Sequence, residues 1–571
     1  MTSLYHQLPL PVSLILIISS ISTAVYINLF LSRFILQSYS GLLRRRNLKN
    51  RARLLALIGI KDDKNSTKKL IVGFLHPYCN AGGGGERVLW TAVALHQRTE
   101  PDTICAIYTG DLGVSKHDII EKVKSRFGII LDPAALLLVP LKTRYLVEAS
   151  TWPRFTLLGQ SLGSLVLGHE ALSALTPDIY IDTMGYAFTF PVFRLLTDVP
   201  IGAYIHYPTI SNDMLKRVSS RNSAHNNSST ISNSLALSYA KLVYYIIFAE
   251  LYSLCLRQAH HLMVNSSWTK NHIDRLLKPW IYRHEEDAEE TEETAKDWTR
   301  SSNPPQSCES QKLDGLRLRI PASDPSAENG QNKTINIPTK KRKFDQATVV
   351  YPPCDVQSFV DFPISPRTST ILSISQFRPE KDQATQIAAF ARFFSSLEAD
   401  DPRRTEIKLV LAGSCRDDAD QKRVDQLKQL AQQLGLAGAV EFRVNISWDQ
   451  LKDLLRNSLV GISTMVDEHF GISIVEFMAS GMIPLVHRSA GPLLDIVVPL
   501  AQDSSQEGET CTGFHADGVA EYAKQLNHIF LSLNAVERAK IQAAARQLAL
   551  RKFGVAQFEL AWITSFRQIR R

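Results

Sequence analysis

Two carboxylates eight positions apart give the clearest chemical signal in this 571-residue chain. Glu468 and Glu476 bracket EHFGISIVE, which follows the apolar strand pattern LVGISTM, so Glu468 precedes a helix and Glu476 lies within it. Eight helical residues rise about 12 Å, roughly the reach from the ribose to the hexose of a nucleotide sugar. Backbone N–H groups at the helix start, at Phe470 and Gly471, would face a diphosphate. Two unrelated surface glutamates are the alternative, which the strand-loop-helix context disfavours.

A second candidate site is the glycine loop NAGGGGER, which begins at Asn80. It lies between the apolar pattern KKLIVGFLHP and an amphipathic helix, so bare backbone and the N–H groups of a helix start can approach a phosphate. Gly83, Gly84 and Gly85 are therefore candidate binding residues for an anionic ligand. The loop is neither GxGxxG nor a P-loop, which weakens an NAD or ATP interpretation. A plain tight turn stays an alternative.

Two cations, Arg378 and Lys381, follow the strand pattern TILSISQF within the sequence RPEKD. Open α/β sheets bind ligands beyond the carboxyl ends of their strands. We therefore expect these side chains to neutralise a departing diphosphate. A solvated charged turn is the competing interpretation.

The elements that must position these residues form two α/β domains, because a chain of this length is too long for one core. Strand patterns alternate with helical patterns, which predicts a parallel sheet in each domain. In the first domain, at 70–281, the strand patterns are KKLIVGFLHP, TICAIYTG, DIYIDTMG, IGAYIHYP and HLMVNSS. In the second, at 346–571, they are ATVVYPPCD, TILSISQF, EIKLVLAGS, AVEFRVN, LVGISTM and IPLVHRS. We expect the carboxy-terminal helices to pack outside, the last crossing back to the first domain.

The amino terminus predicts a membrane anchor. The run from Leu8 to Ser32 has no ionised side chain and is long enough to span a bilayer. Its charge follows the apolar run instead of preceding it, which favours an anchor over a cleaved signal peptide. By the positive-inside rule, residues 1–32 form a lumenal tip and transmembrane helix, residues 33–69 a basic cytosolic linker, and the catalytic domains are cytosolic.

A second apolar stretch, 235–256, contains Lys241, Glu250 and five aromatic residues, so a second full crossing would be costly. Two interpretations stay open: an interfacial helix on a membrane and a buried core helix. The Ser/Asn-rich segment 211–234 before it favours the interfacial one.

Composition excludes other classes. Residues 282–345 are acidic, then rich in Ser, Pro, Asn and Gln, which predicts a disordered charged insertion. The seven scattered cysteines show no CxxC or Cys/His spacing, so we expect reduced thiols and no metal site. The formal net charge of +8 is concentrated after the apolar run, between Arg33 and Arg53, so we expect no nucleic-acid partner.

Together, RPEKD, the two spaced glutamates and the glycine loop resemble glycosyltransferase family 4. Its members are retaining enzymes of the GT-B fold, an α/β architecture in which two Rossmann-like domains face a cleft. The resemblance covers most of residues 70–560, which follow the predicted N-terminal transmembrane helix. Several segments are similar to those of the eukaryotic dolichol-pathway α-1,2-mannosyltransferases that use GDP-mannose: FLHPYCNAGGGGERVLW, YIHYPTIS, YPPCD, SQFRPEKD, DEHFGISIVEFMASG and AGPLLDIVVP.

The resemblance implies a role for each motif residue. Arg378 and Lys381 would bind the diphosphate, Glu476 the ribose hydroxyls and Glu468 the mannosyl hydroxyls near the reacting carbon. His206, which ends IGAYIHYP, is similar to the acceptor-side histidine of the family, although a lone histidine at a strand end can be purely structural. No cofactor and no bound metal are implied.

The resemblance also implies a reaction: retaining transfer of mannose from GDP-mannose to trimannosyl and tetramannosyl chitobiosyl diphosphodolichol, in α-1,2 linkage. The expected place is the cytosolic face of the endoplasmic reticulum membrane, with other mannosyltransferases of the pathway as further candidate partners. Two alternatives stay open: the α-1,3/α-1,6 mannosyltransferase of the same pathway, and a non-catalytic GT-B scaffold subunit.

Overall fold

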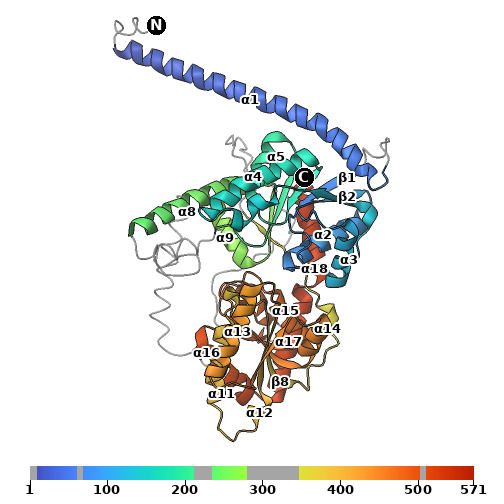
Figure 1. The fold of residues 1–571 in the computed structure, drawn as a ribbon, viewed down its shortest axis with the longest axis vertical. Helices are drawn as coiled ribbons and strands as arrows, with labels where there is room; N and C mark the ends of the chain where they lie inside the picture. Colours follow the sequence, from blue (N-terminus) through green and yellow to red (C-terminus); the bar gives the residue numbers. More distant parts are fainter. Residues whose placement is uncertain (1–9, 61–68, 211–234, 279–345, 502–508, 571) are drawn as a thin grey trace, which may run out of the picture.

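The structure is a computed structural model, and it describes residues 10–60, 69–210, 235–278, 346–501 and 509–570. Two α/β domains lie one above the other in Figure 1, and a long helix, α1 (Leu10–Ala56), rises from the upper, N-terminal domain. Two buried apolar clusters flank each sheet. In the first strand, for example, Ile71 and Leu75 join one cluster while Val72 and Phe74 join the other, because successive side chains of a strand point to opposite faces. The predicted two-domain α/β architecture is confirmed.

The N-terminal sheet has seven parallel strands in the order β3-β2-β1-β4-β5-β6-β7. Its strands are β1 (Leu70–Leu75), β2 (Thr103–Thr109), β3 (Leu136–Pro140), β4 (Ile179–Asp182), β5 (Ile201–Ile205), β6 (His261–Val264) and β7 (Thr348–Val349). The helices of this domain are α2 (Gly84–Thr99), α3 (Lys116–Phe127), α4 (Thr156–Ala174), α5 (Phe190–Leu196), α8 (Leu235–Leu256) and α9 (Ser267–Leu277). The sequence analysis did not predict β3.

The C-terminal sheet has six parallel strands in the order β10-β9-β8-β11-β12-β15. Its strands are β8 (Thr368–Ile374), β9 (Lys408–Gly413), β10 (Val440–Val444), β11 (Ser458–Ser463), β12 (Ile483–His487) and β15 (Phe514–Ala516). Its helices are α11 (Gln383–Ser395), α12 (Arg403–Glu406), α13 (Asp418–Gln433), α14 (Trp448–Asn457), α15 (Ile472–Ser480), α16 (Gly518–Asn527) and α17 (Ala535–Lys552). A short antiparallel pair, β13 (Leu500–Ala501) and β14 (Glu509–Thr510), lies outside this sheet.

Both strand orders reverse direction at one point, between β1 and β4 in the first sheet and between β8 and β11 in the second. The connections on the two sides of such a point lead to opposite faces of the sheet, which leaves a crevice at the carboxyl ends of the strands. Each domain therefore has one preferred place for a ligand.

The chain passes between the domains at both ends of the C-terminal domain. Strand β7 pairs with β6 of the N-terminal sheet, with Met263 opposite Thr348. The last helix, α18 (Val555–Arg570), buries Phe558, Trp562, Phe566 and Ile569 in the N-terminal core, where its red ribbon lies among blue strands in Figure 1. The assignment of all of 346–571 to the C-terminal domain is therefore wrong at both ends, although the expected crossing of the last helix occurs.

Helix α1 is one continuous helix of 47 residues. Its second half packs on the N-terminal domain, where Asn47 Nδ2 donates to Leu172 O (3.0 Å) and Arg51 pairs with Asp178 (2.9 Å). The assignment of 33–69 to a linker is therefore wrong for residues 33–56. The reason is that Leu43, Leu54 and Leu55 are spaced so that they become buried between the basic side chains. Residues 1–9 and the insertion 282–345 lie outside the described residues.

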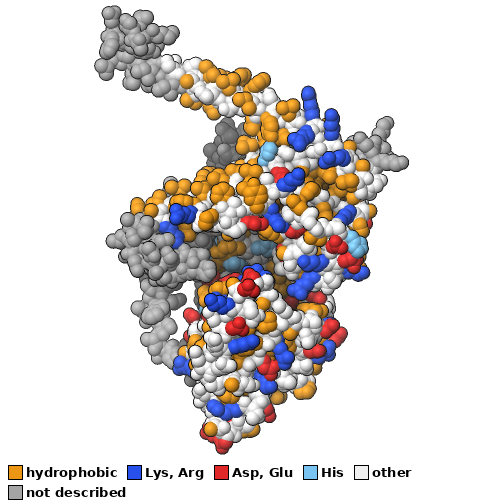
Figure 2. Space-filling view, in the orientation of Figure 1, with side chains coloured by type: hydrophobic (Ala, Val, Ile, Leu, Met, Phe, Trp, Pro, Cys, Tyr) orange, Lys and Arg blue, Asp and Glu red, His pale blue; other side chains and the backbone are white. Residues whose placement is uncertain are grey.

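Helix α8 has two apolar faces. Phe248 and Tyr252 are buried in the domain core, whereas Ile247 and Leu254 on the other face are more than half exposed. Among the described helices, the part of α8 from Ser238 to Leu256 is the one that length and composition would allow to cross a membrane, and 39% of it is buried inside the protein. Figure 2 shows exposed apolar side chains gathered over this helix and along the middle of α1. The core interpretation of 235–256 is thus confirmed for one face of the helix, and the interfacial interpretation stays a prediction for the exposed apolar face.

Candidate active site

The first cluster of polar residues lies beyond the carboxyl ends of β8 and β11, at the reversal point of the C-terminal sheet. A 3-10 turn, Pro379–Lys381, follows β8, while the loop after β11 leads into α15. Thr464 Oγ1 ties the two loops together, because it lies 3.1 Å from Lys381 O and 2.8 Å from Asp382 O. Lys381 Nζ reaches Glu468 Oε2 at 2.7 Å.

The structure therefore joins a predicted cation and a predicted carboxylate in one ion pair. Both side chains keep some exposure, 24% for Lys381 and 16% for Glu468, so a ligand can reach them. An anionic ligand would compete with Glu468 for Lys381, because charge-assisted hydrogen bonds to phosphate are strong. Arg378 begins the same turn, and its buried Nε has no hydrogen-bond partner among the described residues.

Residues of the sequence SAGP, which begins at Ser489, make hydrogen bonds to the loop that carries Glu468. Gly491 N donates to Glu468 O (3.0 Å), and Asp467 N donates to Ser489 Oγ (2.8 Å). A Cβ at Gly491 would lie 2.5 Å from the carbonyl oxygen of His469, so only glycine allows this approach. At the other end of the loop, Gly471 has φ +105°, a backbone conformation that side chains rarely adopt. These glycines explain how the loop turns sharply into α15.

Glu476 lies in the second turn of α15 and is half-buried. Burial raises the pKa of its carboxyl to about 7, and the charge of Arg87 opposes that rise. Arg87 belongs to α2, so a cation of the N-terminal domain acts on a carboxylate of the C-terminal domain. Sequence reasoning missed Arg87, although it is the last residue of the glycine loop NAGGGGER.

The N-terminal side of the site is built around two histidines, each of which follows a strand. His76, directly after β1, lies 2.8 Å from Thr183 Oγ1 and 3.3 Å from Glu86 Oε1. His206 follows β5, and its buried Nε2 has no hydrogen-bond partner among the described residues. Burial, with a further contribution from His76, lowers the pKa of His206 to about 4, so the ring is neutral near pH 7. A Cβ at Gly85 would lie 3.4 Å from that nitrogen, so the glycine leaves space in front of it. Sequence reasoning missed His76, whose signal was its place directly after the first strand.

Comparisons with known proteins show the family of the chain. The family described as ALG11 mannosyltransferase N-terminus matches residues 69–277, and the family described as glycosyl transferases group 1 matches residues 357–547. The Mus musculus protein named GDP-Man:Man(3)GlcNAc(2)-PP-Dol alpha-1,2-mannosyltransferase is 41% identical over 514 residues, which cover 89% of each chain. A Xenopus laevis protein of the same name is 42% identical over 506 residues, which cover 88% of each chain. The chain belongs to the ALG11 mannosyltransferase family.

A solved structure supports the fold of this ALG11-family glycosyltransferase. The structure titled trehalose-6-phosphate from E. coli bound with UDP-2-fluoro glucose aligns with a TM-score of 0.53 over 87% of this chain and 99% of that chain. At 11% identity the likeness concerns the GT-B fold alone.

Gly83 has another role in this ALG11-family chain, and the side chain of Phe470 is not available to a ligand, although its expected backbone contact stays a prediction. The N–H of Gly83 donates to Glu86 Oε2 (2.5 Å) and caps α2, so this donor is not available to a phosphate. Phe470 is 4% exposed and packs on Tyr351 in the C-terminal core, so only its backbone can face a ligand. Gly84 instead allows close approach of the domains, because a Cβ there would lie 2.8 Å from Ile472 Cδ1 of α15.

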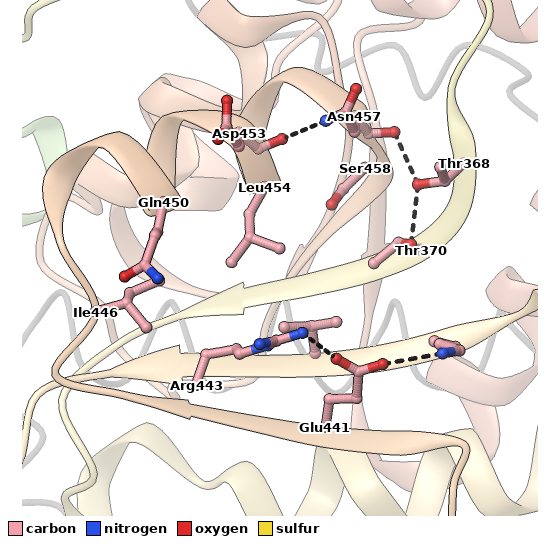
Figure 3. Close-up of a pocket in the computed structure, with 12 residues that line it drawn as sticks. Thr368, Thr370, Glu441, Arg443, Ile446, Gln450, Asp453, Leu454, Asn457 and Ser458 are labelled. Atoms are coloured by element: carbon pink, nitrogen blue, oxygen red, sulfur yellow. Dashed lines mark hydrogen bonds and ion pairs between the residues drawn. The ribbon is translucent and has the colours of Figure 1, made fainter.

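A cavity of about 310 Å³ lies elsewhere in the C-terminal domain, between α14 and the sheet (Figure 3). The first residues of three strands, Thr368, Lys408 and Ser458, line it, together with Glu441 and Arg443, which form an ion pair. These strand starts lie at the edge of the sheet opposite to Lys381 and Glu468, so the cavity is not part of the candidate site.

Among the described residues, no group of three or more His, Cys, Asp or Glu side chains has a metal-binding arrangement.

The raised pKa of Glu476 predicts a pH-dependent stability. Its folded pKa of about 7 lies above the ordinary 4.5, so the ligand-free fold loses stability as the pH rises from about 4.5 to 7 and stays at that lower level above 7. Glu476→Gln removes this cost. We expect the variant to be more stable by about 1–3 kcal/mol at pH 8 and by clearly less at pH 5, measured by urea denaturation. Glu406→Gln, the same change at an exposed site of α12, is the matched control. An equal gain at both pH values would contradict the assignment.

Proposed function

We propose that this chain is an α-1,2-mannosyltransferase that uses GDP-mannose. Its acceptors are dolichol-diphosphate-linked trimannosyl and tetramannosyl chitobiose, to which it adds the fourth and fifth mannoses with retention. The observation that carries the proposal is the Lys381–Glu468 pair, which puts a cation for a diphosphate and a carboxylate for sugar hydroxyls at the reversal point of the C-terminal sheet. The names of the relatives at 41–42% identity support this donor, acceptor and linkage.

On the donor side, the ion pair suggests an exchange of partners. The diphosphate of GDP-mannose takes Lys381 from Glu468, and the released carboxylate accepts hydrogen bonds from mannosyl hydroxyls. Arg378 contributes a second cation to the diphosphate. Negative charge grows on the departing GDP as the glycosidic bond breaks, so these cations stabilise the transition state more than the bound substrate. The carboxyl of Glu476, whose pKa is raised by burial, binds the ribose hydroxyls.

On the acceptor side, His206 positions the attacking hydroxyl. Its Nε2 is buried and unpartnered among the described residues, and the lowered pKa keeps the ring neutral, so the nitrogen can accept a hydrogen bond from the acceptor. The proposed chemistry uses no covalent enzyme intermediate: the hydroxyl attacks on the face from which the phosphate leaves, and that phosphate receives the proton. We propose that no bound metal takes part, so addition of a chelator should leave the rate unchanged.

The test is an assay of the purified chain with several nucleotide sugars and a lipid-linked trimannosyl acceptor. GDP-mannose alone should be consumed, the product should gain two mannoses, and α-1,2-mannosidase should remove both. Products that resist this enzyme but yield to α-1,3- or α-1,6-mannosidase would identify the other mannosyltransferase of the pathway. A folded protein that binds GDP but transfers nothing would support the scaffold alternative.

We further propose that the N-terminal domain lies on the cytosolic face of the endoplasmic reticulum membrane. Helix α1 exposes apolar side chains between residues 25 and 35, and its next turns are tied to the body through Tyr39 Oη and His169 Nε2 (2.6 Å) and through Ser40 Oγ and Leu196 O (2.7 Å). The anchor thus enters the body at α4 and α5. An apolar patch on α4 and α8 lies exposed in the same domain: Leu162, Val166, Tyr239, Val243, Ile247, Leu251 and Leu254. Such a face next to an anchor suits the boundary between lipid headgroups and acyl chains.

The proposed roles of Glu476, Lys381 and Glu468 predict different kinetic effects. Glu476→Ala should mainly weaken GDP binding and raise KM, because the ribose contact exists in the bound substrate and the transition state alike. Lys381→Ala should lower kcat by about a hundredfold or more, because one lost stabiliser of developing charge costs about 3–4 kcal/mol. Glu468→Ala should lower kcat while sparing GDP affinity, since GDP has no mannose. Lys408→Ala, at the opposite edge of the sheet, is the control. If calorimetry found that Glu468→Ala weakens GDP binding as much as Glu476→Ala, the two roles would be wrongly assigned.

The membrane-facing patch predicts an effect that depends on the acceptor. In a chain that lacks residues 1–40, the double variant Ile247→Asp, Leu254→Asp should bind vesicles more weakly than the same chain without these substitutions. It should also transfer less mannose to a long-chain lipid acceptor. Transfer to a short soluble acceptor should stay unchanged, because the patch concentrates the acceptor and takes no part in bond formation. Val536→Asp, at an exposed apolar residue of α17, is the control. Equal losses with both acceptors would show that the patch supports the fold rather than the membrane contact.

A further inference from the structure

Three aromatic rings meet where the two domains touch beside the candidate site. Tyr207 and Trp268 come from the N-terminal domain, and His469 comes from the C-terminal loop that carries Glu468. The ring centroid of His469 lies 4.1 Å from that of Tyr207 and 5.1 Å from that of Trp268, and the interplanar angles are 27° and 22°. Tyr207 and Trp268 are themselves 6.1 Å apart at 11°. The three rings are thus nearly parallel and contact one another across the domain boundary.

Each of two proposed site residues is the chain neighbour of one of these rings. Tyr207 directly follows His206, and His469 directly follows Glu468. Adjacent residues share a peptide unit of fixed geometry, so a contact between the rings of Tyr207 and His469 limits the distance between the backbones of His206 and Glu468. The stack therefore links the acceptor-side histidine to the sugar-side carboxylate.

The surroundings hold the rings in place. Ser267, the first residue of α9, donates to Asp495 with its backbone N (2.8 Å) and its hydroxyl (2.6 Å), so the helix start next to Trp268 is tied to the C-terminal domain. Tyr351 Oη donates to the same carboxylate at 2.7 Å. His272, one turn after Trp268, packs edge-on against that ring at 4.1 Å. On the other side, the Gly491–Glu468 backbone hydrogen bond holds the loop of His469.

The imidazole of His469 stacks as a neutral ring. Burial lowers the pKa of His469 to about 4, and the nearby charge of Lys381 acts in the same direction. Dispersion and ring geometry therefore carry the contact, and a neutral aromatic ring of similar size can replace the imidazole.

We infer that His469 is a positioning residue for transfer: its ring, stacked on Tyr207 and Trp268, sets the place of Glu468 relative to His206 when the domains are together. This rests on the proposed function, because it assigns Glu468 to the donor sugar and His206 to the acceptor. Misplacement of reacting groups by about 1 Å costs on the order of a hundredfold in rate. Loss of the stack should therefore act on turnover, whereas GDP binding depends on Lys381 and Glu476.

The test compares His469→Ala with His469→Phe in the full chain, using GDP-mannose and the lipid-linked trimannosyl acceptor at saturation. His469→Ala should lower kcat at least tenfold, with GDP affinity by calorimetry unchanged within about twofold. His469→Phe should recover most of the lost turnover. His528→Ala, which removes a histidine ring that packs on Phe514 inside the C-terminal domain, is the matched control and should keep wild-type turnover.

A double-mutant cycle with Tyr207→Ala separates positioning from folding. If the two rings act through one contact, the combined variant should be little slower than either single variant. If the losses in kcat of the two single variants multiply in the double variant, the inference is overturned. It is also overturned if His469→Phe is as slow as His469→Ala, because the imidazole nitrogens would then be needed. A wild-type protein that does not turn over GDP-mannose would refute the proposed function. If the wild-type protein turns over GDP-mannose and the His469→Ala variant is equally active, only the positioning role is refuted.

Discussion

Parallel strands all end at the same edge of their sheet, and this constraint brings together the groups at the centre of the candidate site. The loops after β8 and β11 are neighbours only because those strands are adjacent at the point where the strand order reverses. That adjacency brings Lys381 to Glu468, although 87 positions separate them in the chain. The same geometry in the N-terminal sheet brings His76, after β1, to Thr183, after β4. Contact between the domains then places these two edges opposite each other, where Gly84 meets Ile472.

Several groups at this place are kept in states that cost stability. Glu476 is a half-buried carboxyl with a pKa of about 7, and His206 is an imidazole with a pKa of about 4 and an unpartnered nitrogen. Buried polar groups without partners are unfavourable in folding, so their survival here is best explained by a ligand that supplies the partners. Lys381 and Glu468 do not lack partners in this way, because their opposite charges form an ion pair while no ligand is bound. The ligand-free site thus combines one internal ion pair with groups that await a hydrogen bond.

The two domains are also fastened at places far from the reacting groups. Strand β7 and helix α18 return the chain to the N-terminal domain, and Trp562 of α18 donates to buried His96. Asp495 binds the start of α9 at the domain boundary. These contacts hold the back of the interface together, so the rings of Tyr207, Trp268 and His469 meet in a defined geometry. Helix α1 is fastened to the same N-terminal domain, so the proposed membrane anchor and the proposed acceptor side belong to one domain.

The amino-acid sequence by itself determined the two parallel α/β domains, the strand-loop-helix context of Glu468 and Glu476, and the pairing of Arg378 and Lys381 with a strand end. These features are local, because apolar periodicity and turn residues act within about twenty positions. The tertiary structure decided what depends on distant partners. It placed β7 in the N-terminal sheet, since the local sequence of a two-residue strand does not indicate which strand it will pair with. It packed residues 33–56 as a helix, because Leu43, Leu54 and Leu55 contribute to stability only when the surface of the N-terminal domain buries them. Gly83 became a helix cap and Phe470 a core residue, while Arg87, His76 and His469 joined the site from separate segments. Electrostatic influence and ring stacking act through space, so only the folded chain shows which of its many charged and aromatic residues they join.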